Sequence, residues 1–230
     1  MKLLAIDTTE SGCSAALHID GENHGIFELA PRKHSELILP MIDRVLSDSD
    51  IGQSQLDAVA FCRGPGSFTG VRIAASVAQG LAVAQDLPIV AISSLTALAQ
   101  GCYRRLGKTQ VLAGLDARMS EVYWSVCELH EGVMQTIDNE VVARIENLAP
   151  IQGNQWWGLG SAWDEFESDL HAQFADQVQG VEKGQTIDAL DVAALAAAAY
   201  AKGETVSIDQ AVPIYLRDDV AAKPKAKPKA

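Results

Sequence analysis

The sequence predicts a mixed α/β fold built from two related subdomains, the second a reduced copy of the first. A run of apolar residues closed by an aspartate occurs at 3–7 and again at 111–116. A Gly-x-Gly-Ser turn after an apolar run occurs at 64–67 and again at 158–161. Because both patterns recur in the same order, duplication of one α/β unit explains them better than chance does.

In the first half, short runs rich in β-branched and aromatic residues indicate strands, and longer alanine- or leucine-rich segments indicate helices. Asp20-Gly21 is typical of a hairpin turn and separates the second strand from the third. Ser35 stands at the start of the first helix and is predicted to cap it. The expected strands are 3–6, 13–19, 25–29, 56–62 and 88–92, and the expected helices are 35–46, 73–84 and one that opens at 95–99.

The second half begins by repeating the first. After the strand at 111–116, the run at 122–127 takes the place of the second strand. This half is poorer in helices and ends with an alanine-rich helix at 188–202, which Gly203 stops. The predicted division is an N-terminal subdomain at 1–107, a smaller C-terminal subdomain at 108–217 and a Lys/Pro/Ala tail at 218–230, expected to be disordered.

The segment from Gly64 to Arg72 joins a predicted buried strand to a predicted helix. Its backbone N–H groups stand at the helix start, where an anion is favoured. No Gly-Lys-Ser/Thr follows and Arg72 is the first cation, so the segment is not a P-loop. Two interpretations stay open: a loop that faces a phosphate or an interface, and a tight turn whose glycines permit positive φ.

Composition and charge narrow the choice of partners and compartment. The net charge is −12, and the lysines of 223–230 contribute +4, which leaves about −16 on the rest of the chain. Phosphate backbones repel so acidic a body, and the tail is therefore interpreted as a solubilising segment rather than an RNA-binding arm.

No run approaches the ~18 apolar residues of a membrane helix, and the N-terminus lacks a signal-peptide pattern. The scattered cysteines fit reduced thiols of a cytoplasmic protein; they are Cys13, Cys62, Cys102 and Cys127.

Duplicated β-β-β-α-β-α units are the architecture of the actin-like and sugar-kinase-like ATPases, the ribonuclease H-like fold, in which two hairpins hold a nucleotide's phosphates. Asp7, Thr8 and Thr9 occupy the place of the first hairpin; their hydroxyls and amides suit an oxyanion, and the carboxylate suits a metal-bound water. In the second copy, Ala117 and Arg118 replace the two threonines, so the second phosphate-binding hairpin is chemically changed. The candidate phosphate or nucleotide contacts are Asp7, Thr8, Thr9, Gly66, Ser67 and Thr69.

Five motifs in order give the chain a family resemblance. They are Leu4–Thr9, His34–Leu37, Arg63–Arg72, Asp116–Tyr123 and Pro213–Arg217. On these motifs, and over nearly its full length, the chain resembles the TsaB (YeaZ) family of bacterial tRNA threonylcarbamoyladenosine biosynthesis proteins. The resemblance implies a cytoplasmic accessory subunit that binds and activates the related enzyme TsaD, joins TsaE in a larger complex, and forms a homodimer when alone.

The resemblance also implies where the chemistry lies. TsaD transfers threonylcarbamoyl to the adenosine beside the anticodon, so this chain is expected to have no catalytic residue and no cofactor of its own. ATP or ADP is expected only in the assembled complex, and tRNA contact only indirectly. The TsaD group holds a metal through a His-x-x-x-His pair, and the aligned positions here are Ser94 and Leu98, which cannot replace two imidazoles. No metal site is therefore predicted, and the histidines lack ligand spacing; they are His18, His24, His34, His130 and His171.

The resemblance implies that the first two helices form the face that meets TsaD, or a second copy when TsaD is absent. The first helix carries two apolar rows, one through Leu37, Met41 and Val45, which is more than one sheet normally covers. The second helix carries a small-residue row that lets another helix approach closely. The competing interpretation is that the protein's own elements cover these rows. The predicted partner-binding residues are His34, Glu36, Leu37, Pro40, Met41, Arg44, Val45, Gly70, Ala74 and Ala78.

The sequence leaves competing functions to weigh. A nucleotide-binding ATPase or kinase of the actin-like superfamily is favoured by the Asp7 hairpin but opposed by the altered second hairpin. A peptidase is less favoured, because the loop at 66–70 lacks the Gly-x-Ser-x-Gly spacing of a nucleophile elbow. Ser67 is instead predicted to be a helix cap. On the accessory-subunit hypothesis, Met41→Asp or Ala74→Arg is expected to abolish pairing in a folded monomer.

Overall fold

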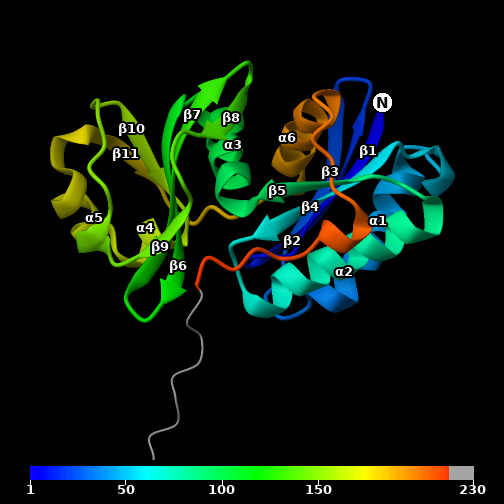
Figure 1. Ribbon diagram of the computed structural model, residues 1–230, viewed down its shortest axis with the longest axis horizontal. Helices are drawn as coiled ribbons and strands as arrows, with labels where there is room; N and C mark the ends of the chain where they lie inside the picture. The colour runs from blue at the N-terminus through cyan, green and yellow to red at the C-terminus, as the bar shows by residue number, and fades with distance from the viewer. Residues whose placement is uncertain (218–230) are drawn as a thin grey trace, which may run out of the picture.

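Two β-sheets organise the chain in the computed structural model, which describes residues 1–217 (Figure 1). The strands of the first sheet are β1 (Lys2–Asp7), β2 (Gly12–Ile19), β3 (Glu22–Leu29), β4 (Ala58–Gly64) and β5 (Ile89–Ser93). Their order is β3-β2-β1-β4-β5, with β1, β4 and β5 parallel and the β1–β2 and β2–β3 pairs antiparallel. All five expected strands of the first half are therefore present.

The second sheet repeats this order. Its strands are β6 (Gln110–Arg118), β7 (Glu121–His130), β8 (Val133–Thr136), β9 (Val141–Ala143), β10 (Trp156–Leu159) and β11 (Val178–Glu182). The order β11-β10-β6-β7-β8 matches that of the first sheet when β6 is set against β1, and β9 is an addition paired with β7. Because direction as well as order repeats, the predicted duplication is confirmed.

Three layers of helices enclose the two sheets (Figure 1). The helices are α1 (His34–Asp48), α2 (Phe68–Gln85), α3 (Ser94–Leu106), α4 (Ser161–Glu165), α5 (Glu167–Phe174) and α6 (Ala189–Ala201), with short 3₁₀ turns at Gln53–Gln55, Ile145–Asn147, Ala175–Gln177 and Ile208–Gln210. Helices α1 and α2 cover the outer face of the first sheet, and α4 and α5 that of the second. Helices α3 and α6 lie between the sheets.

The two central helices are exchanged between the halves. Helix α3 follows a strand of the first sheet but packs on β6, β7 and β8, whereas α6 follows the second sheet but packs on β1 and β2. Arg104 of α3 joins Asp191 of α6 through two hydrogen bonds, of 2.7 and 2.9 Å. The predicted boundary between residues 107 and 108 falls in the link from α3 to β6 and stays a prediction, and the tail at 218–230 lies outside the described residues.

Side chains alternate between two cores along the central strands, as they do in sheets covered by helices on both faces. On β1, Leu4 and Ile6 belong to the core beneath α1 and α2, whereas Leu3 and Ala5 belong to the core shared with α3 and α6. The central core is rich in alanine, which lets the alanine-rich α6 approach the sheet closely.

The four cysteines are free and buried, and burial raises the pKa of the Cys13 and Cys127 thiols to about 11.

Two helix starts differ from expectation. Helix α1 begins at His34, after Lys33, and Ser35 lies within it and accepts no capping hydrogen bond, so the predicted Ser35 cap is wrong. Helix α2 begins at Phe68, five residues before the expected start, because the Ser67 hydroxyl accepts a hydrogen bond from the Gly70 N–H at 3.1 Å. The predicted Ser67 cap is confirmed.

Among the described helices, none has the length and apolarity to cross a membrane.

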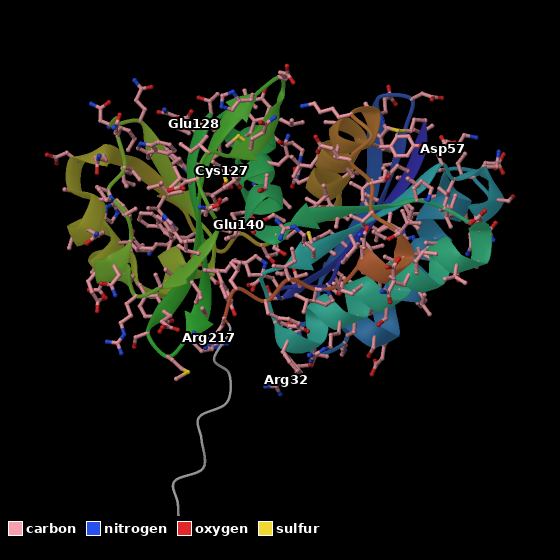
Figure 2. The ribbon with its side chains drawn as sticks, in the orientation of Figure 1. Arg32, Asp57, Cys127, Glu128, Glu140 and Arg217 are labelled. Atoms are coloured by element: carbon pink, nitrogen blue, oxygen red, sulfur yellow. The ribbon has the colours of Figure 1, made fainter. Side chains whose placement is uncertain are left out.

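Residues 211–217, which we call the C-terminal strap, cross from one half to the other. Ala211 is buried against α2, and the Ile214 N–H donates to the Arg63 carbonyl at 2.8 Å. Arg217 then pairs with Glu121 and lies beside Met119 in the β6–β7 hairpin. Figure 2 shows Arg217 where the described chain ends, below the second sheet. The strap therefore ties the first helix layer to the second sheet.

Candidate functional site

The glycine-rich loop between β4 and α2 packs directly on the turn after β1. The Ser67 N–H donates to the Thr9 carbonyl at 2.7 Å, and the Thr8 hydroxyl donates to the Gly70 carbonyl at 2.8 Å. A Cβ on Gly66 would stand 2.6 Å from the Thr9 carbonyl oxygen, and one on Gly70 would overlap that of Thr8. Gly66 and Gly70 are thus required for close approach of two backbones, whereas Gly64 has the positive φ, of 102°, that the tight-turn interpretation invokes.

This packing occupies the place where the first hairpin of an actin-like protein would meet a phosphate. Asp7, Thr8 and Thr9 have no exposed surface. In this conformation the three residues pack against the loop, and a phosphate could reach them only if the loop moved away; their contact with a phosphate stays a prediction. Ser67 and Thr69 are exposed and Gly66 is half-buried, so for these three the predicted contact stays a prediction.

Asp7 is the centre of a buried polar network. Its Oδ1 accepts hydrogen bonds from the Thr9 hydroxyl at 2.6 Å and the Thr9 N–H at 3.3 Å, and the Ser94 hydroxyl donates to that of Thr9 at 3.2 Å. Oδ2 has no hydrogen-bond partner among the described residues, although the nearby Cys62 thiol favours the ionised form. Burial outweighs these contacts and raises the pKa of Asp7 to about 6.

Two residues of α3 stand where the resemblance places a metal-binding histidine pair. Ser94 belongs to the Asp7 network, and the Leu98 side chain packs against Gly160. Both are fully buried and offer no imidazole. Within residues 1–217, no group of three or more histidine, cysteine, aspartate or glutamate side chains could hold a metal ion.

The second half repeats the contact between loop and turn with different chemistry. The Asp116 N–H donates to the Ser161 hydroxyl at 3.0 Å, and Gly160 packs so closely on the Gly114 carbonyl that a Cβ there would overlap it. The Asp116 carboxylate accepts two hydrogen bonds from Arg118, one from its backbone N–H at 2.7 Å and one from its guanidinium at 2.8 Å. This aspartate is engaged inside its own hairpin rather than free for a ligand.

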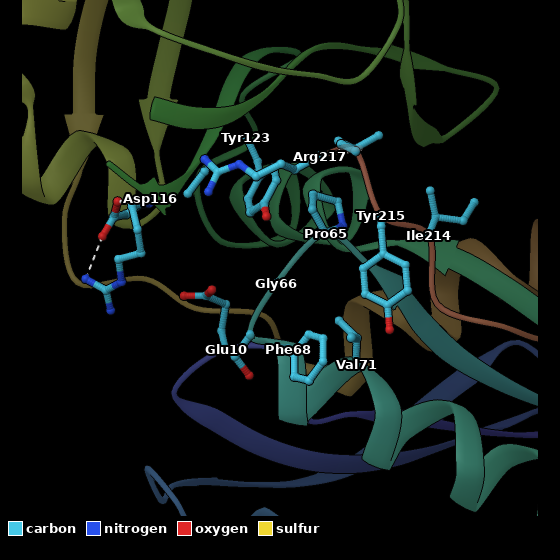
Figure 3. Close-up of a pocket in the computed structure, with 14 residues that line it drawn as sticks. Glu10, Pro65, Gly66, Phe68, Val71, Asp116, Tyr123, Ile214, Tyr215 and Arg217 are labelled. Carbon is cyan, nitrogen blue, oxygen red and sulfur yellow. Dashed lines mark hydrogen bonds and ion pairs between the residues drawn. The ribbon is translucent and has the colours of Figure 1, made fainter. Parts of the chain in front are cut away.

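A cleft of about 380 Å³ separates the two turns, and the C-terminal strap closes one side of it (Figure 3). Glu10 points into this cleft, across from Asp116. Burial, followed by the charges of Asp7 and Asp116, raises the pKa of Glu10 to about 7. Glu10 is not among the residues predicted from the sequence, because its environment combines two hairpins that lie more than a hundred residues apart.

A second hollow, of about 420 Å³, lies on the outer surface between α1 and α2. We call it the α1–α2 groove; it is lined by Ser35, Ile38, Leu39, Phe68, Thr69, Arg72, Ile73, Ser76 and Val77. Leu39 is 53% exposed and Phe68 65% exposed, which is unusual for large apolar side chains close together. The groove is open to solvent and predominantly apolar.

None of the predicted partner-binding residues is among those that line the α1–α2 groove, and only four of them are at least partly exposed. Glu36, Pro40 and Arg44 are exposed and Leu37 is half-buried. The remaining predicted contacts are covered by the protein's own sheet; they are His34, Met41, Val45, Gly70, Ala74 and Ala78. The apolar rows of α1, apart from the half-buried Leu37, and the small-residue row of α2 pack inward in this structure, and the role of these six residues in partner binding stays a prediction. His34 is held by its Nε2, which lies 3.1 Å from the Gly12 carbonyl.

The geometry defines a class of protein before any comparison is made. Two sheets of the same strand order, with a helix exchanged between them, form the duplicated ribonuclease H-like fold of actin-like and sugar-kinase-like proteins. The comparisons narrow this class. A family model described as "TsaD: tRNA N6-adenosine threonylcarbamoyltransferase" matches residues 26–225.

Individual relatives are more similar still. The TsaB protein of Escherichia coli is 39% identical over 97% of each chain, and that of Haemophilus influenzae is 39% identical over 97% of this chain and 96% of its own. The solved structure of YeaZ from Pseudomonas aeruginosa superposes with a TM-score of 0.87 at 40% identity, covering 94% of this chain and 99% of that one. The chain belongs to the TsaB (YeaZ) family of tRNA threonylcarbamoyladenosine biosynthesis proteins.

Proposed function

We propose that this protein is a non-catalytic accessory subunit that binds and activates TsaD through the α1–α2 groove. The observation that carries the proposal is the groove itself, a solvent-open apolar hollow with Leu39 and Phe68 exposed on its walls. Such a surface on a globular domain indicates a protein partner. A pair of helices from each side would bury on the order of 1,200–2,000 Å², which is enough for a specific complex.

The glycine-rich loop covers the turn after β1, where an actin-like protein would hold a phosphate. This supports an accessory role over an ATPase or kinase. The Thr8 and Thr9 carbonyls lie against the glycine loop, and Asp116 is neutralised by Arg118, so neither hairpin offers a free phosphate grip in this conformation. The chain's match to a TsaD family model supports a partner of related fold, because a face able to pair with a second copy can pair with a homologue.

The partner site is tested with surface substitutions, in place of the buried Met41 and Ala74. Leu39→Asp is expected to abolish the heterodimer with TsaD in light scattering, because it places a charge in the apolar groove. Ile137→Asp is the matched control, since Ile137 is 48% exposed and belongs to the second sheet's surface. Both variants should unfold in urea close to the wild-type midpoint. An undiminished heterodimer with Leu39→Asp would contradict the proposed face.

The function is tested by reconstitution. TsaD, TsaE, the adenylate-forming enzyme, tRNA, threonine, bicarbonate and ATP are combined with and without this chain, and threonylcarbamoyladenosine is measured on the tRNA. Product that depends on the wild-type chain and is lost with Leu39→Asp supports an accessory subunit acting through the groove. Equal product without the chain would contradict the proposal.

A further inference from the structure

Arg72, on the second turn of α2, carries a guanidinium that lies over the ring of Phe68 and beside the ring of Tyr215. Its Cζ lies 3.3 Å from the centroid of the Phe68 ring and 5.5 Å from that of Tyr215. No hydrogen bond or carboxylate partner of Arg72 occurs among residues 1–217. Most other arginines there do have a carboxylate within 4 Å; they are Arg44, Arg63, Arg104, Arg105, Arg118, Arg144 and Arg217.

Stacking fixes the plane of the guanidinium without using its donors. The guanidinium carbon lies over the Phe68 ring, and the Tyr215 ring is a second, more distant neighbour, 6.3 Å from the Phe68 ring and inclined to it by 39°. A stacked guanidinium has already lost much of its rotational freedom, so less entropy is lost when it binds. The edge left open matches a group with two acceptor oxygens, which is a carboxylate or a phosphate.

The surroundings of Arg72 favour a carboxylate carried by a protein. Arg72 lines the apolar α1–α2 groove together with Leu39, Ile73 and Val77. The net charge of −12 opposes the approach of a polyphosphate backbone, whereas a single carboxylate at the edge of an apolar helix would fit both the groove and the arginine.

Tyr215 reaches Arg72 from the C-terminal strap. The strap is fixed on both sides of Tyr215, by the Ile214 N–H on the Arg63 carbonyl and by Arg217 on Glu121. Tyr215 also lines the inter-sheet cleft, as Phe68 does (Figure 3). The orientation of Arg72 therefore depends on a segment that also contacts the second sheet.

We propose that Arg72 anchors the partner by a bidentate ion pair with a carboxylate presented at the α1–α2 groove, and that Tyr215 is a positioning residue for it. The inference rests on the proposed function, and it names the chemistry that the partner must bring. A guanidinium in this setting acts as a central, partly desolvated anchor of the interface, the kind of residue that dominates binding energy.

The test is the dissociation constant for TsaD, measured by calorimetry at low and high salt. Arg72→Gln is expected to weaken binding by roughly 10- to 100-fold, the usual worth of a hydrogen-bonded charge, with a smaller loss at high salt. Arg72→Lys should recover only part of this, because lysine cannot form a planar two-point contact. Tyr215→Phe should bind like the wild type, and Tyr215→Ala should weaken binding less than Arg72→Gln does.

The controls separate the two proposals. Arg144→Gln removes the same charge from an exposed position on the second half and should leave binding unchanged. If wild-type chain does not bind TsaD at all, the proposed function fails. If the wild type binds and Arg72→Gln binds equally well, only the Arg72 anchor fails. If Arg72→Gln binds TsaD normally but loses affinity for isolated tRNA, a phosphate rather than a carboxylate is the ligand and the proposal is overturned.

Discussion

Asp7→Asn is expected to make the protein more stable above neutral pH and to lose that advantage in acid. Asp7 is fully buried, its Oδ1 accepts both hydrogen bonds from Thr9, and its Oδ2 has no hydrogen-bond partner among the described residues. An asparagine can keep the Oδ1 contacts and place its amide where Oδ2 stands. The substitution therefore removes a buried charge while the shape and the accepted hydrogen bonds are retained.

The size of the effect is set by the pKa of Asp7. Burial raises this pKa from 3.8 to about 6, and each unit is worth about 1.4 kcal/mol, so the ionised carboxylate destabilises the fold by about 3 kcal/mol. An acid whose pKa is higher in the folded state holds its proton there while the unfolded chain releases it. The free energy of unfolding of the wild type therefore falls as pH rises from about 4 to about 6, and stays lower above that.

Urea unfolding at intervals from pH 4.5 to pH 8 measures the difference between Asp7→Asn and wild type. The free energy of unfolding of the variant, relative to wild type, should increase by about 2 kcal/mol over this range, because part of the effect is already present at pH 4.5. Asp43→Asn, on the exposed side of α1, is the control for removal of one carboxylate and should show no comparable trend. A constant difference between Asp7→Asn and wild type across the range would refute the reasoning, because it would mean that Asp7 does not change its protonation there.

Two further predictions concern the glycine-rich loop. Ser67→Ala should lower the free energy of unfolding by about 1 kcal/mol, because the Gly70 N–H loses its capping acceptor, and Ser67→Asp should restore most of it; denaturation midpoints compare the two. Gly70→Ala should cost roughly 1–3 kcal/mol or prevent folding, because the added methyl would overlap the Thr8 carbonyl. Gly80→Ala is the control, since nothing lies within 4 Å of a Cβ there, and it should be neutral or stabilising. Wild-type stability in Gly70→Ala would show that the two backbones are not in close contact.

Much of the architecture could be predicted because it depends on local patterns. The strand runs, the Asp20-Gly21 turn and the repeated Gly-x-Gly-Ser turns each carry their own signal, and their order indicated the duplication. The early start of α2 was missed because residues 68–72 include a phenylalanine and a glycine and lack the alanine pattern of residues 73–84. The Ser67 cap, which the sequence did suggest, is the feature that begins the helix there.

The candidate surface was harder to predict, and α1 and α2 show why. Two apolar rows on α1 suggested a surplus of exposed apolar area, yet the sheet and neighbouring elements cover both, and Met41 is only 6% exposed. The exposed apolar residues of the groove are instead Phe68, which precedes the expected helix, and Leu39, which belongs neither to the row through Leu37 nor to the second row, of Ile38, Ile42 and Leu46. Periodicity identifies which residues share a face, but it does not say how wide a face the neighbouring elements cover.

The sequence by itself determined the strand and helix content, the duplication, the buried cysteines and, through its ordered motifs, the family. These properties are local or additive along the chain. Only the tertiary structure decided what the glycine-rich loop does, how Asp7 and Glu10 come to hold raised pKa values, and how Tyr215 meets Arg72. Each depends on contacts between segments distant in sequence, where burial and close approach, rather than residue type, set the chemistry.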